Sequence, residues 1–111
     1  MIIMTVESLI KECGFEVVCM PSPAKAVDGV YIGDLLSWVM GKADSSNVWI
    51  TIMSNINVIA VATLTDVSCI LLAEGVKLDP EVILTAKDKG VNVLSSSLSA
   101  YEIAKLVSGV L

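Results

Sequence analysis

Apolar and polar positions follow two alternating patterns along the last two thirds of the chain. Nearly continuous apolar runs, typical of buried strands, lie at 48–53, 67–73 and 91–94. Each run is followed by a segment in which apolar residues recur at helical spacing, and these segments end near residues 64, 89 and 108. This β-α-β-α-β-α alternation over residues 48–108 favours a parallel sheet joined by right-handed crossovers.

The first third of the chain has a less regular pattern. Apolar residues between Val6 and Cys13 share one helical face, and Thr5 and Gly14 are suited to begin and end that helix. Strands are predicted at 15–20 and 30–32, and a further short helix from 35 to 40. We therefore predict one α/β domain over residues 1–111, with three layers and a mostly parallel or mixed sheet of about five strands.

Composition excludes several classes of protein. Of the 111 residues, 55% are apolar and 17% are charged, which excludes a disordered chain. No apolar run approaches the length of about 20 residues that a membrane span needs. The net charge of −5 argues against nucleic acid and anionic membrane surfaces as partners. The three cysteines are widely spaced within apolar segments, which predicts buried thiols in a reducing cytoplasm and neither a metal site nor a disulfide.

Two missing residue types restrict the chemistry further. The chain has no His, and all seven basic residues are Lys, so it has no Arg. It therefore lacks an imidazole base or metal ligand and a guanidinium that binds phosphate through two hydrogen bonds. A Ser nucleophile would need a buried Lys as its base, and the loop after Cys19 contains two prolines that remove amide donors. We expect no catalytic residues and no cofactor.

Three polar loops are predicted to meet where the parallel strands end, which is where ligands bind in open parallel sheets. They offer hydroxyl, amide and carboxylate groups from Ser54, Asn55, Asn57, Glu74, Gly75, Ser95, Ser96 and Ser97. These residues are candidate ligand-binding residues for a small polar or anionic molecule. The same residue types are also the common choices for helix caps and turns, so a purely local role is the alternative.

Three further residues are candidates for an interface between proteins. Trp38 falls near the polar side of the helix predicted at 35–40, and an exposed Trp often anchors an interface. Asp34 precedes that helix and either caps it or accepts a hydrogen bond from a partner. Trp49 lies on the first strand of the regular region, where the alternative is a place in the core of the sheet.

Four segments, taken together in this order, resemble the DRTGG domain family: GVYIGDLLSWVMG (29–41), WITIMSNINVIAVA (49–62), VSCILLAEGVKLD (67–79) and GVNVLSSSLSAYEIA (90–104). The resemblance implies an α/β fold similar to the N-terminal domain of HPr kinase/phosphorylases. It also implies a regulatory role without catalysis. The Asp-Arg-Thr of the family should fall near Ser54-Asn55-Ile56, and its Gly-Gly near Glu74-Gly75. The acid, the base and one glycine are therefore replaced, so an anion held by that Arg is not expected here.

These inferences favour a non-catalytic regulatory or protein-interaction module that acts as a homodimer and senses a small ligand or a partner protein. The excess of apolar residues supports the dimer, because surface left uncovered by a small domain often forms an interface. The alternative is a small-anion or nucleotide sensor with its site at the carboxyl ends of the parallel strands. A small enzyme is the least favoured class.

Overall fold

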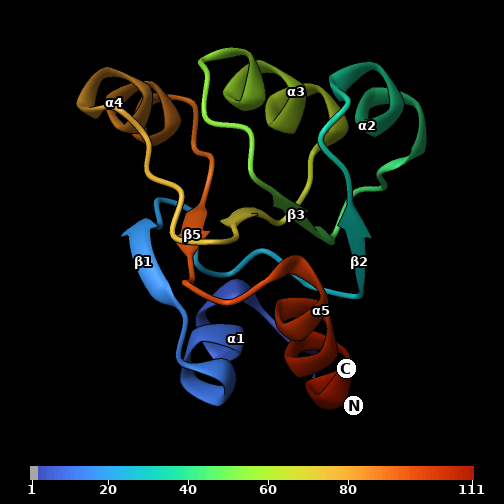
Figure 1. Cartoon of the computed structure of the whole chain (residues 1–111). Coiled ribbons are helices and arrows are strands. Elements are labelled where there is room, and N and C mark those ends of the chain that lie inside the picture. Colours follow the sequence, from blue (N-terminus) through green and yellow to red (C-terminus); the bar gives the residue numbers. More distant parts are fainter. Residues whose placement is uncertain (1–2) are drawn as a thin grey trace.

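The computed structural model describes residues 3–111 and forms a five-stranded mixed sheet between two layers of helices (Figure 1). The sheet has the order β1-β5-β4-β3-β2, and only β1 runs antiparallel to the other strands. The strands are β1 (Glu16–Cys19), β2 (Gly29–Ile32), β3 (Asn47–Thr51), β4 (Cys69–Leu72) and β5 (Val93–Ser95). The helices are α1 (Val6–Cys13), α2 (Leu36–Lys42), α3 (Asn57–Thr65), α4 (Pro80–Asp88) and α5 (Ala100–Val110). This architecture confirms the predicted fold class.

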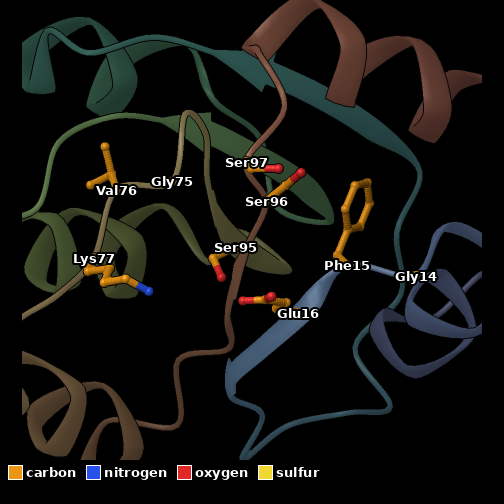
Figure 2. A pocket seen from close by; sticks show the side chains of 9 residues that line it. All are labelled: Gly14, Phe15, Glu16, Gly75, Val76, Lys77, Ser95, Ser96 and Ser97. Atoms are coloured by element: carbon orange, nitrogen blue, oxygen red, sulfur yellow. The ribbon is translucent and has the colours of Figure 1, made fainter.

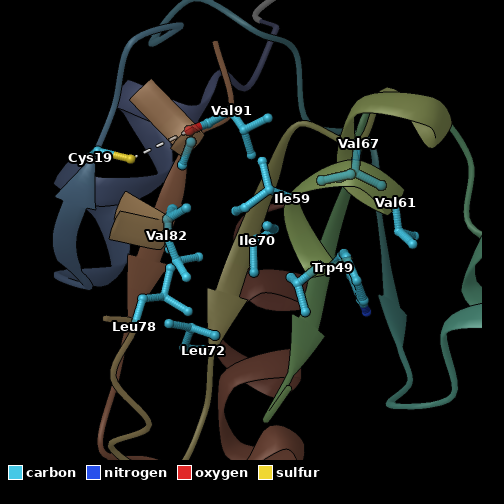
Figure 3. Close-up of a cluster of buried hydrophobic side chains, with 14 of the residues drawn as sticks. Cys19, Trp49, Ile59, Val61, Val67, Ile70, Leu72, Leu78, Val82 and Val91 are labelled. Carbon is cyan, nitrogen blue, oxygen red and sulfur yellow. Dashed lines mark hydrogen bonds between the residues drawn. The ribbon is translucent and has the colours of Figure 1, made fainter. Parts of the chain in front are cut away.

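The two helical layers cover opposite faces of the sheet, as Figure 1 shows. Helices α2, α3 and α4 connect consecutive parallel strands and pack on one face, around Trp49, Ile70 and Leu72 (Figure 3). Helices α1 and α5 pack on the other face, around Ile50 and Leu71. All four residues of β4 are buried, as expected for a central strand covered on both faces.

Local capping interactions set several helix ends where the sequence predicts them. The Thr5 hydroxyl accepts a hydrogen bond from the Ser8 amide at 3.1 Å, and Gly14 ends α1 with φ of 74°. Ser99 and Glu102 form the predicted capping box at the start of α5. These contacts lie within one turn of the chain, so their sequence signals are sufficient to identify them.

Helix α2 departs from its prediction. It begins at Leu36 and continues through Gly41 to Lys42, and its N-cap is Leu35 rather than Asp34. The capping role predicted for Asp34 is therefore wrong. The Asp34 carboxylate instead accepts hydrogen bonds from the Thr51 hydroxyl at 2.8 Å and the Ile52 amide at 3.0 Å. A long-range contact with the end of β3 thus replaces the local cap.

None of the helices in residues 3–111 has the length and apolar character that a membrane crossing requires.

Candidate functional site

Two of the three polar loops are joined at the carboxyl edge of the parallel strands. The Glu74 amide donates to the Leu98 carbonyl, and the Gly75 amide donates to the Ser96 carbonyl, both at 2.9 Å. Glu74 and Gly75 have consecutive positive φ values of 59° and 71°, which form the sharp turn that brings these amides to the serine loop. The loops after β4 and β5 therefore form one continuous rim.

A cavity of about 340 Å³ lies beside this rim (Figure 2), and it is lined by Gly14, Phe15, Glu16, Gly75, Val76, Lys77, Ser95, Ser96 and Ser97. The sequence predicts four of these residues, namely Gly75 and the three serines. Gly14, Phe15, Glu16, Val76 and Lys77 were not predicted. The antiparallel direction of β1 explains the first three, because β1 begins where the parallel strands end and Glu16 pairs with Ser95.

Two opposite charges face each other across this cavity. Figure 2 shows the Lys77 ammonium and the Glu16 carboxylate extending toward Ser95 from opposite sides. Among residues 3–111, the ion pairs are Glu7 with Lys11 and Lys25 with Asp66, so neither cavity charge is paired within the protein. The cavity therefore presents one cation, one anion and hydroxyl groups to a ligand.

The serine hydroxyls differ in their availability. The Ser96 hydroxyl accepts a hydrogen bond from the Leu98 amide at 3.1 Å and so stabilises the loop. In the described part of the chain, the hydroxyls of Ser95 and Ser97 make no hydrogen bond to protein atoms. These two hydroxyls are free to donate to or accept from a bound molecule.

The third predicted loop does not reach this cavity. Ser54, Asn55 and Asn57 are exposed and follow β3, which is separated from β5 by β4. The Asn55 side chain accepts a hydrogen bond from the Asn57 amide at 2.9 Å, so it stabilises the turn that begins α3. The predicted site thus contains residues from two loops rather than three, and Glu74 contributes its backbone to the rim.

The candidate interface residues have different environments. Trp38 is 58% exposed, and the Lys42 ammonium lies 4.7 Å from the centre of its ring. Trp49 is fully buried, and its indole N–H donates to the Gly33 carbonyl at 2.9 Å. The interface role predicted for Trp49 is therefore wrong, because a strand covered by helices on both faces places its side chain in the core.

The two edges of the sheet are not equally protected against pairing with another strand. The β1 edge carries Glu16 and a bulge between Val17 and Cys19. The β2 edge, Gly29–Ile32, has no charged residue, proline or bulge. The Gly33 amide donates to the Ile50 carbonyl of β3. Backbone N–H and C=O groups of successive residues point to opposite sides of a strand, so those of Val30 and Ile32 point away from β3, toward the open edge.

Exposed apolar side chains lie on β2 and in the segment that follows it, Ile32 on the face of α1 and α5 and Leu35 and Trp38 at α2 over the other face. Ile32, Leu35 and Trp38 are 49%, 59% and 58% exposed. Within residues 3–111, no hydrogen bond from outside the sheet reaches the backbone of Val30 or Ile32. The β2 edge therefore combines free backbone donors and acceptors with apolar surface.

The thiols are not activated as nucleophiles. Burial raises the pKa of the Cys69 thiol to about 12, against an ordinary value of 9.0. Burial also raises the pKa of Cys13 and Cys19, and in Cys13 the nearby Glu12 carboxylate adds to this effect. Thiolate chemistry at neutral pH is disfavoured at all three positions.

Comparison with known proteins gives a family and a match in fold to solved structures. The family model described as the DRTGG domain matches residues 8–110. A crystal structure of the CBS and DRTGG domains of the regulatory region of Clostridium perfringens pyrophosphatase, complexed with its activator diadenosine tetraphosphate, is similar with a TM-score of 0.69. The identity is 14%, and the match covers 89% of this chain but 44% of that one. No curated protein matches the chain.

Proposed function

Because this chain belongs to the DRTGG domain family, we propose that it is a non-catalytic regulatory module that acts as a homodimer. The similarity to a regulatory region supports the regulatory role. The raised thiol pKa values and the lack of His support the absence of catalysis. The unprotected β2 edge with its apolar border is the observation that carries the dimer.

Two copies of β2 are suited to pair antiparallel across a two-fold axis at Tyr31. Val30 of one copy then lies opposite Ile32 of the other, and the outward backbone groups of each pair form two hydrogen bonds. Exposed Ile32 would be covered at the same time. An ordinary interface of about 800 Å² per partner would take roughly 13% of the 5935 Å² surface.

The same geometry predicts a response to salt. Asp28 and Asp34 flank β2, and antiparallel pairing brings Asp28 of one copy toward Asp34 of the other. Repulsion between these two carboxylates weakens association, and dissolved salt screens that repulsion. The dimer is therefore expected to tighten as ionic strength rises, whereas a dimer held by ion pairs would weaken.

Sedimentation equilibrium of the full chain tests the proposal. We expect a dimer at micromolar concentration, and we expect Ile32→Lys to be monomeric because a charge on the edge strand blocks pairing. Leu84→Lys is the matched control, since Leu84 is 64% exposed on α4, away from β2, and that variant should remain dimeric. A monomeric wild-type protein, or a dimer that both variants leave unchanged, would refute the β2 interface.

A second candidate function, the sensing of a small ligand, is favoured by the cavity between Glu16 and Lys77. Thermal unfolding in the presence of nucleotides, acyl phosphates and uncharged or zwitterionic metabolites tests it. A ligand at 100 times its dissociation constant stabilises the folded protein by about 2.7 kcal/mol. If no compound of any class raises the unfolding temperature, sensing fails, and the dimer proposal is unaffected.

The thiols also support a location for the module. Cys13, Cys19 and Cys69 are free, and free thiols persist where the compartment is reducing. We propose that the module works in the cytoplasm, which mass spectrometry of the thiols in protein isolated from cells tests directly. Oxidation of Cys13, the most exposed of the three, in the bulk of that protein would contradict the proposal.

A further inference from the structure

The cavity between Glu16 and Lys77 continues into a second, more apolar space. This space measures about 190 Å³ and is lined by Glu16, Val17, Val18, Val76, Lys77, Leu78, Ile83 and Ser95. Glu16, Val76, Lys77 and Ser95 line both cavities, so the two form one groove between β1 and the segment 75–78. Charges and hydroxyls lie in the middle of this groove, with apolar side chains at one end.

We infer that this groove binds a free α-amino acid with an apolar side chain. The Lys77 ammonium would pair with the ligand carboxylate, and the Glu16 carboxylate would pair with the ligand ammonium. The apolar end, where Val17 is exposed and Val18 and Ile83 are half-buried, would take the side chain. This inference rests on the proposed sensing function and names the ligand class.

The charge distribution favours a zwitterion over a net charge of either sign. One carboxylate and one ammonium cancel, and each lacks a partner among residues 3–111. A zwitterion satisfies both groups at once, whereas an anion would satisfy Lys77 and be repelled by Glu16. The free hydroxyls of Ser95 and Ser97 can accept from the ligand ammonium or donate to its carboxylate.

Nucleotides fit the same groove poorly. Polyphosphates are usually held by several cations or by Arg, and this groove has a single Lys in a chain with no Arg and a net charge of −5. Phe15 is the one aromatic residue lining it, and that ring is 6% exposed because it packs in the core on the α1–α5 face. No aromatic surface is therefore available in the groove for a base to stack on.

Isothermal titration of the full chain with L-leucine and L-phenylalanine tests the inference. Each amino acid is compared with its amide, which lacks the carboxylate, and its N-acetyl derivative, which lacks the ammonium. We expect both derivatives of each amino acid to bind at least about tenfold more weakly, because each leaves one groove charge without a partner. ATP serves as the polyanionic comparison and is expected not to bind.

Two variants assign the contacts. Glu16→Gln and Lys77→Gln should each weaken L-leucine binding by about tenfold or more. Glu16→Gln should not weaken the binding of N-acetyl-leucine and should strengthen it, since this anion has no ammonium to pair with Glu16 and the variant removes a repelling carboxylate. Glu81→Gln and Lys89→Gln are the matched controls, because each removes an exposed charge at α4 that does not line the groove. Both should leave L-leucine binding unchanged.

The outcomes separate this inference from the functions it rests on. Equal binding of the amino acids and their derivatives, or L-leucine binding that both groove variants leave intact, would overturn the zwitterion site. Binding of ATP alone would overturn it as well but would keep the sensing function. If no compound binds, the zwitterion site fails, while sensing is judged by the broader thermal-unfolding panel and the dimer by sedimentation.

Discussion

Replacement of Asn92 by Ala should destabilise the fold strongly, because this side chain connects three parts of the chain. Asn92 is 1% exposed and directly precedes β5. Its amide oxygen accepts from the Ser22 amide at 2.9 Å, and its NH₂ group donates to the carbonyls of Ser22 at 2.7 Å and Ser68 at 2.9 Å. The side chain thus ties the segment after β1 to the starts of β4 and β5.

The size of the effect follows from these three hydrogen bonds. Each contributes about 1 kcal/mol net, so the loss of all three in Asn92→Ala should cost about 3 kcal/mol. A chain of 111 residues has a total stability of roughly 6–17 kcal/mol, so the variant should still fold. Its melting temperature should fall by about 13 °C.

Urea denaturation followed by circular dichroism measures the loss. The midpoint should fall while the slope stays unchanged, since the folded state keeps its extent. Asn57→Ala is the matched control, because Asn57 is exposed at the start of α3 and no hydrogen bond of its side chain to other protein atoms is seen in residues 3–111. If Asn92→Ala loses no more than this control, water replaces the amide and the hydrogen bonds do not stabilise the fold as argued.

Two further predictions concern stability at single positions. Because the folded protein keeps the Cys69 proton up to a pKa of about 12 while the unfolded thiol ionises above 9.0, stability should fall between these pH values by up to about 1.4 kcal/mol per pH unit. Urea midpoints across this range should decline more steeply than in Cys69→Ala, and equal slopes would contradict the burial argument. Gly75→Ala should cost about 1 kcal/mol through the backbone alone, because a residue with a Cβ disfavours a φ of 71° and the added methyl group would contact nothing within 4 Å. Gly109→Ala should gain about 0.5 kcal/mol, because Ala favours the helical backbone of α5. Calorimetry that gives both changes the same sign would contradict the backbone explanation.

Sequence patterns predicted the elements that local interactions determine. The caps at Thr5 and Ser99 involve residues within three positions, and the buried strand β4 is recognised from its apolar run alone. Asp34 was assigned wrongly because its local signal, a carboxylate before a helix, competes with the Thr51 hydroxyl across 17 residues of sequence. Composition and spacing contain no information about which of the two partners the carboxylate will bind.

The candidate site was predicted in part for a similar reason. The loops after β4 and β5 were identified because parallel strands end at a common edge. Glu16 and Lys77 were missed, and for Glu16 the cause is the direction of β1. A short apolar strand has the same pattern whether it runs parallel or antiparallel, and only its pairing with Ser95 places Glu16 in the groove.

The strand order also separates the two proposed surfaces. The groove lies at β1 and β5, and the proposed dimer edge is β2, with β4 and β3 between them. The two surfaces share no side chain and have two strands between them. The free-energy effects of changes at such distant sites usually add, so neither proposal depends on the other. A ligand that did change the dimer affinity would have to move β4 or β3, whose buried residues form both cores. By linkage, the dimer would then change ligand affinity by the same factor, and that coupling is what a regulatory role of this module within one assembly would require.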